Sequence, residues 1–135
     1  MVTVLFACVH NAGRSQMAAA LFNAAADPSK ARAISAGTHP ADRVHPVVAQ
    51  AMREIDLDVS AATPQLLTPA LAAQAQWLIT MGCGDECPVV PGVRRDDWAL
   101  ADPAHQPIER VRAIRDEIQR RVQQFVYSRD LARTL

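Results

Sequence analysis

The sequence predicts an α/β fold, with a four-stranded parallel sheet between helices in three layers. Short apolar runs alternate with segments of helical periodicity, an order typical of parallel sheets whose crossovers cover both faces. The length of 135 residues suits one hydrophobic core and is too short for two. We therefore expect a single domain that spans residues 1–135.

The first half of the chain predicts two strands, each followed by a helix. Residues 2–6 form an apolar, β-branched run typical of a buried strand. A helix is expected over residues 15–25, with Ser15 in the position of the cap. Residues 31–37 predict a second strand that ends at a glycine, and His45-Pro46 opens a second helix with one apolar face.

The second half repeats this alternation. Thr68-Pro69 has the chemistry of a helix start and predicts a short helix to residue 74. Residues 76–81 form an apolar run that indicates the third strand, and residues 97–100 are a weaker fourth. Residues 107–127 carry apolar side chains at intervals of three and four and predict a long final helix.

Composition and charge exclude several classes of protein. Half of the chain is apolar, and 14 basic residues balance 14 acidic ones, so no overall field attracts nucleic acid or an anionic membrane. No segment has the length of a membrane span or the pattern of an export signal. The three cysteines are an odd number, which argues against a secreted disulfide framework. We expect a cytoplasmic monomer whose cysteines have chemical roles.

The predicted first strand leads through a tight loop into a helix, and this loop has the features of an anion site. Such a turn directs backbone N–H groups and the positive end of the helix dipole into one concavity. Cys8 begins the loop and Arg14 follows it with a fork of donors that fits a tetrahedral oxyanion. The pattern predicts a thiol nucleophile that attacks phosphate or arsenate, with Cys8 and Arg14 as catalytic residues. The predicted oxyanion-binding residues are Val9, His10, Asn11, Ala12, Gly13, Arg14 and Ser15. The alternative is a buried core cysteine beside a surface arginine.

Residues 8–18, CVHNAGRSQMA, resemble the phosphate-loop signature of arsenate reductases that share the low-molecular-weight tyrosine phosphatase fold. The run SAGT at residues 35–38 also matches this family. The resemblance implies a low-molecular-weight phosphatase-like fold and the reduction of arsenate to arsenite in arsenic detoxification. Some relatives bind a structural potassium ion, but Ala19 and Gln65 stand where its ligands would be, so we expect no metal site.

Cys83 and Cys87 follow the predicted third strand. Gly82 and Gly84 bracket Cys83, so the segment can rearrange at low cost. Two thiols on a mobile loop near a nucleophilic thiol suit a disulfide relay. The alternatives are half of a zinc site, for which the ligand set is incomplete, and a pair of small buried hydrophobic residues. Residues 80–91 resemble the resolving-cysteine loop of these reductases, which implies that Cys83 and Cys87 are catalytic.

The resemblance also implies an external thiol reductant and no bound cofactor. Thioredoxin-coupled members of the family place two cysteines in this loop, as this chain does. The sequence of residues 82–92, GCGDECPVVPG, resembles that of the family branch that is often coupled to mycothiol and mycoredoxin. We favour thioredoxin and keep mycothiol with mycoredoxin as the alternative.

Asp102 precedes a proline in a WxLxDPA setting. Fold relatives place an aspartate before a proline over the anion loop, which implies that Asp102 is the general acid. The alternative is a turn residue, since Asp-Pro favours turns. We also expect Asn11 to hold the loop in shape and Ser15 to donate to the Cys8 thiolate.

Two other functions use the same loop. A phosphotyrosine phosphatase would resolve a Cys8 adduct with water, but Gln16 stands where phosphatases usually carry proline and no tyrosine follows Asp102-Pro103. A redox or oxyanion sensor would use the same thiols without turnover. Arsenate reduction also explains Cys83 and Cys87, so it is the favoured hypothesis.

Overall fold

The computed structural model describes residues 1–83 and 87–133. These residues form a four-stranded sheet in the order β2-β1-β3-β4, and every pair of neighbouring strands is parallel. The elements, in chain order, are β1 (Val2–Cys8), α1 (Arg14–Ala25), β2 (Ala31–Gly37), α2 (Pro46–Arg53), α3 (Pro69–Ala72), β3 (Trp77–Thr80), β4 (Arg94–Asp97) and α4 (Ile108–Ser128). The α/β class and the parallel sheet predicted from the sequence are confirmed.

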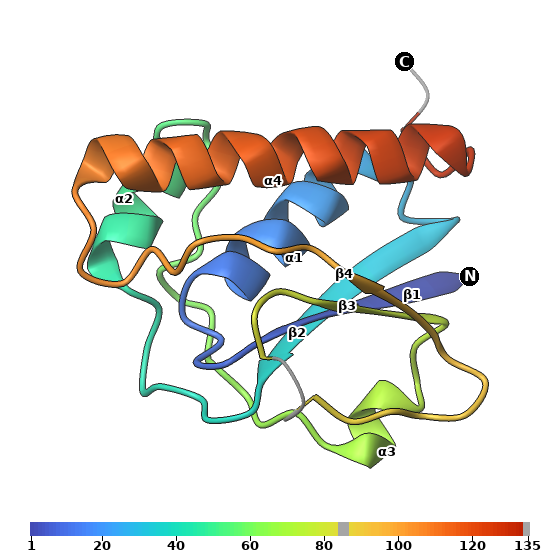
Figure 1. Ribbon diagram of the computed structural model, residues 1–135. Helices are drawn as coiled ribbons and strands as arrows, with labels where there is room; N and C mark the ends of the chain where they lie inside the picture. Colours follow the sequence, from blue (N-terminus) through green and yellow to red (C-terminus); the bar gives the residue numbers. More distant parts are fainter. Residues whose placement is uncertain (84–86, 134–135) are drawn as a thin grey trace.

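Helices cover both faces of the sheet. Helices α1, α2 and α4 lie on one side, and the short α3 lies on the other (Figure 1). Two clusters of buried apolar residues follow this division. The larger cluster joins β1 to α1, α2 and α4, and the smaller one joins β1 and β3 to α3 and to Cys83 and Cys87. The three-layer arrangement is therefore confirmed.

Strand β1 divides its side chains between the two clusters. Val4, Phe6 and Cys8 belong to the larger cluster, whereas Leu5 and Ala7 belong to the smaller one. This alternation is the two-residue period of a strand that is buried on both faces. Consequently Cys8 faces the layer of α1, on the opposite side of the sheet from the other two cysteines.

Several predicted boundaries differ from those in the structure. Strand β1 ends at Cys8, two residues later than predicted. The fourth strand is Arg94–Asp97, not residues 97–100; its four side chains are exposed, because an edge strand is held by backbone pairing to β3 and needs no apolar face. Helix α1 begins at Arg14, and its cap position is Gly13, so Ser15 does not cap the helix. Helix α3 ends at Ala72, two residues earlier than predicted.

Helix α4 is tied to the end of α2 by an ion-pair cluster. Glu54 pairs with Arg112 at 2.6 Å and with Arg115 at 2.9 Å, and Arg115 also donates to the carbonyl of Ala51. The hydrogen bond from Arg112, together with Arg115, lowers the pKa of Glu54 to about 2.

Among the helices in the described part of the chain, none has the length and apolar character needed to cross a membrane.

Candidate anion and thiol site

Residues 8–15, called the anion loop below, run from the last residue of β1 into the first turn of α1 and are held from outside by the segment that follows β2. Four loop carbonyls accept backbone N–H groups of that segment: Cys8 from Thr38 at 3.1 Å, Val9 from His39 at 2.8 Å, His10 from Ala41 at 2.9 Å and Ala12 from His45 at 2.9 Å. The N–H and C=O groups of one trans peptide unit point in opposite directions. The N–H groups of Val9, His10, Asn11 and Gly13 are therefore directed away from this segment, into the loop.

These inward N–H groups make the loop a candidate site for an anion. Within residues 1–83 and 87–133 they have no hydrogen-bond acceptor, and the loop leads directly into α1, whose first turn adds further free donors. Asn11 has a positive φ of 51°, a conformation that asparagine tolerates better than most residues. The backbone thus forms the concavity that the sequence predicts.

A buried chain of hydrogen bonds ends at the Cys8 sulfur. Ser15 Oγ lies 2.9 Å from Cys8 Sγ and accepts a hydrogen bond from Asn11 Nδ2 at 2.7 Å. Asn11 Oδ1 in turn accepts from Gln16 Nε2 at 3.2 Å and from the backbone N–H of Gln65 at 3.0 Å. These two donors set the orientation of the Asn11 amide.

The last contact of this hydrogen-bond network joins Ser15 Oγ to Cys8 Sγ, and either atom can be its donor. A hydroxyl has one proton, and Ser15 Oγ already uses an acceptor position for Asn11. The hydroxyl proton can point at Cys8 Sγ, so Ser15 can donate to the sulfur as the sequence predicts.

Arg14 is buried, with 7% of its surface exposed, and lies between the loop and two later segments. Its Nη1 donates to the carbonyl of Leu100 at 3.0 Å. Gly82, with a φ of +99°, packs against the guanidinium so closely that a side-chain Cβ there would collide with Nη1. Arg14 is therefore held in one orientation, as a fork that binds an oxyanion requires.

Asp102 lies at the mouth of the loop. Its Oδ2 is 4.0 Å from Arg14 Nη2, and its side chain is 46% exposed. Its Oδ1 accepts the backbone N–H of Ala104 at 2.9 Å, and Pro103 packs directly on Gly13. The residue thus makes the turn that Asp-Pro favours, and the same turn places its second oxygen beside the guanidinium.

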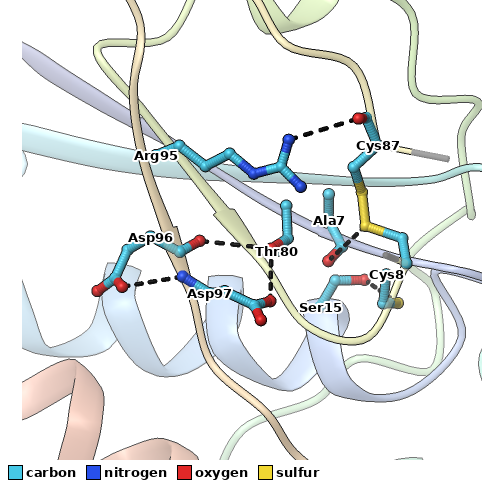
Figure 2. Close-up of a disulfide and its surroundings, with 9 residues drawn as sticks. Ala7, Cys8, Ser15, Thr80, Cys87, Arg95, Asp96 and Asp97 are labelled. Carbon is cyan, nitrogen blue, oxygen red and sulfur yellow. Dashed lines mark hydrogen bonds between the residues drawn. A yellow bond between two sulfur atoms is a disulfide. The ribbon is translucent and has the colours of Figure 1, made fainter. Parts of the chain in front are cut away.

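Cys83 and Cys87 form a disulfide with a Cα–Cα distance of 5.7 Å, while Cys8 is free. Both are buried in the smaller apolar cluster, and neither is a thiolate that a zinc ion could use in this state. Cys83 Sγ lies 4.0 Å from the carbonyl oxygen of Ala7, the residue before Cys8. Arg95 of β4 donates to the carbonyl of Cys87 at 3.4 Å (Figure 2). Gly84, predicted to ease movement of this segment, lies outside the described residues.

Some contacts at the site have no signal in the sequence. Gln16 marks a departure from phosphatases, but its hydrogen bond to Asn11 is evident only in the structure. The backbone of Gln65 and the carbonyl of Leu100 are also missed. Backbone groups carry no residue-type signature, so only the folded chain reveals these two contacts.

Comparisons with known proteins agree with this geometry. The family model described as low molecular weight phosphotyrosine protein phosphatase matches residues 3–134. Arsenate reductase 2 of Staphylococcus saprophyticus is 33% identical over 129 residues, which cover 91% of this chain and 95% of the relative.

Two solved structures extend the comparison. The thioredoxin-dependent arsenate reductase of Corynebacterium glutamicum is 40% identical with a TM-score of 0.80; the match covers 95% of this chain and 61% of that longer one. An arsenate reductase in the phosphate-binding state is 29% identical with a TM-score of 0.79, and the match covers 95% of this chain and 98% of that one. The chain belongs to the low-molecular-weight phosphotyrosine protein phosphatase family.

Proposed function

We propose that this chain is an arsenate reductase, formed by one domain over residues 1–135, that uses Cys8, Cys83 and Cys87 in turn. One observation carries the proposal: Cys8 is free in the anion loop while Cys83 and Cys87 are joined as a disulfide. This pairing is the oxidised state in which a three-thiol relay ends. The arsenate reductase relatives in the same family support the assignment.

The first step uses only groups at the anion loop. Arsenate binds to the inward N–H groups and to Arg14, and the Cys8 thiolate attacks arsenic. A sulfur–arsenic bond forms and an arsenic–oxygen bond breaks, and the oxygen leaves as water with a proton from Asp102. No redox change has occurred at this point. Phosphate binding by a relative supports the oxyanion class.

The second step transfers two electrons to arsenic. The Cys83 thiolate attacks the Cys8 sulfur, so that an S–S bond forms and the S–As bond breaks with its electron pair kept by arsenic. Arsenite is released. Cys87 then attacks the Cys83 sulfur, which frees Cys8 and leaves the Cys83–Cys87 disulfide. Since Cys83 packs on the far side of β1 from Cys8, this segment must move during the relay.

The disulfide is reduced by an external thiol system, for which we favour thioredoxin. The Corynebacterium glutamicum relative, named as thioredoxin-dependent, supports this choice. Mycothiol with mycoredoxin is the alternative. No bound cofactor takes part, because every electron in the scheme passes between sulfur atoms and arsenic.

The test supplies arsenate with one reductant system at a time, either thioredoxin with its reductase or mycothiol with mycoredoxin, and measures continuous arsenite release. The proposal expects release by the wild type and none by Cys8→Ser. Dependence on thioredoxin and loss of turnover in Cys87→Ser would support the three-thiol relay. Turnover by Cys87→Ser with mycothiol would replace it with the low-molecular-weight thiol route. Arsenite release by Cys8→Ser would overturn the proposal.

Phosphoester hydrolysis is a second candidate, because Cys8, Arg14 and Asp102 are in place while the other two cysteines are paired. Water would then resolve the Cys8 adduct, and no later thiol is needed. Rates of arsenite release and of 4-nitrophenyl phosphate hydrolysis, measured on one preparation, rank the two activities. We expect arsenate reduction to be the faster.

A further inference from the structure

All four histidines of the chain lie around the anion loop. His10 belongs to the loop itself. His39 and His45 lie on the segment that holds the loop, through backbone bonds to Val9 and Ala12. His105 follows Pro103, which packs on Gly13. The proposed reaction uses none of these imidazoles.

The ring of His10 is oriented by the backbone of His39, on the segment that follows β2. Its Nδ1 lies 3.2 Å from the carbonyl oxygen of His39. A carbonyl oxygen only accepts, so Nδ1 carries the proton in the neutral ring and Nε2 is bare. Protonation then converts Nε2 from an acceptor into a donor. The ring is exposed, so this change occurs at the surface of the loop.

Three of the imidazoles and one carboxylate form an interacting group. Burial lowers the pKa of His45 below its ordinary value of 6.5, and the charges of His10 and His105 lower the pKa further. The charge of Asp102 acts in the opposite direction. Arg14 lies beside Asp102, and the exposed Asp42 and Arg43 lie between His39 and His45 on the same segment. When protonated, His10 and His105 each repel a protonated His45, and an anion beside the rings relieves this repulsion.

We propose that His10, His45 and His105 form a histidine rim at the mouth of the anion loop, whose protonation strengthens the binding of tetrahedral oxyanions. The rim supplies positive charge that the chain as a whole lacks, since its acidic and basic residues balance. It rests on the proposed function only in that the loop binds an oxyanion. The affinity for the oxyanion then falls as the pH rises through the range in which histidine loses its charge.

The expected effect is moderate. A charge pair at an exposed site changes affinity by about two- to threefold. Three imidazolium groups together should strengthen oxyanion binding by about tenfold between about pH 8 and about pH 5.5. The effect should weaken at high ionic strength, because exposed charges are screened.

The probe is sulfate and the protein is Cys8→Ser, so that neither the anion nor the thiol titrates in this range. Calorimetry measures the dissociation constant across the pH range at constant ionic strength. Cys8→Ser should show the tenfold change. When His10→Gln, His45→Gln and His105→Gln are combined with Cys8→Ser, the affinity for sulfate should be low and independent of pH. When His10→Arg and His105→Arg, at the two exposed positions, are combined with Cys8→Ser instead, the affinity for sulfate should be high at every pH.

The outcomes separate the rim from the loop. An unchanged pH dependence after the three glutamine substitutions would overturn the rim and leave the anion loop standing. A failure of Cys8→Ser to bind sulfate at any pH would overturn the loop, and the rim with it. Circular dichroism on each variant identifies any that has lost its fold. In that case His10→Gln with His105→Gln, both at exposed positions, must still remove most of the pH dependence.

Discussion

The anion loop and the segment that carries the disulfide lie on opposite sides of β1 and are held by different forces. In the loop, residues 8–15, backbone hydrogen bonds fix the carbonyl groups. A buried series of side-chain hydrogen bonds runs from Asn11 through Ser15 to Cys8. Cys83 and Cys87 are held by one covalent bond and by apolar packing. A hydrogen bond from Arg95 to the carbonyl of Cys87 is one polar contact of this pair.

This difference matches what each region does in the proposed reaction. A nucleophile must keep its geometry, and directional hydrogen bonds maintain geometry well. Resolving thiols must travel, and apolar packing is non-directional, so it can be broken and remade without leaving many unpaired polar groups. The chain therefore combines a fixed site with a movable one across a single strand.

The largest expected effects separate the two regions by their cysteines. Cys8→Ser should lower arsenite release by about 10⁴-fold or more, because the nucleophile is lost. Cys83→Ser should also stop arsenite release, yet it should keep hydrolysis of 4-nitrophenyl phosphate at the wild-type level, since the loop does not depend on that sulfur. Both rates are measured on the same preparations. Loss of hydrolysis in Cys83→Ser would contradict the independence of the two regions.

Gly82→Ala tests the place where the two regions meet. The new Cβ would collide with the Arg14 guanidinium, and a displaced catalytic group costs about 10²-fold in rate. We expect kcat/KM to fall for both arsenate and 4-nitrophenyl phosphate. Gly92→Ala is the matched control, because Gly92 also has a positive φ but nothing lies within 4 Å of the place that a Cβ would take there. Equal losses in both variants would show that backbone strain, not Arg14, is responsible.

Gln16→Leu tests the far end of the chain of hydrogen bonds in the loop. Without the Gln16 amide, Asn11 Oδ1 keeps one of its two hydrogen bonds, the one from the backbone N–H of Gln65. One neutral hydrogen bond contributes about 1 kcal/mol, so alkylation of Cys8 near neutral pH should slow by about fivefold. The measurement is the pH profile of iodoacetamide modification. Gln50→Leu, at an exposed position on α2, should leave the profile unchanged.

The smallest effect lies outside both regions. The pKa of Glu54 is lowered from 4.5 to about 2 by Arg112 and Arg115, so its contribution to stability is present above pH 4.5 and is lost as the pH falls toward 2. The melting temperature should therefore fall over this window, and Glu54→Gln should fall less. The side chain is exposed, so the difference should be small. Activity at neutral pH should be unaffected.

The strand, loop and helix that form the candidate anion site were predictable as elements because their determinants are local. Cys8 and Arg14 are separated by five residues, and any chain that turns from a buried strand into a helix within that distance exposes its N–H groups there. The strand at Ala31–Gly37 and the start of α2 at Pro46 were predicted for the same reason. Weak local patterns failed, as at β4, whose charged residues pair only because β3 is beside them.

The sequence by itself therefore determined the anion loop, the alternation of strands and helices, and the class of chemistry that one thiol and one arginine permit. Only the tertiary structure decided which face of β1 each cysteine occupies, how the Asp102 carboxylate lies relative to Arg14, and which histidines surround the loop. Asp102 is 88 residues from Arg14 in the sequence. Such pairs meet because of the strand order β2-β1-β3-β4, and that order is set by the packing of the whole chain, not by any short stretch of it.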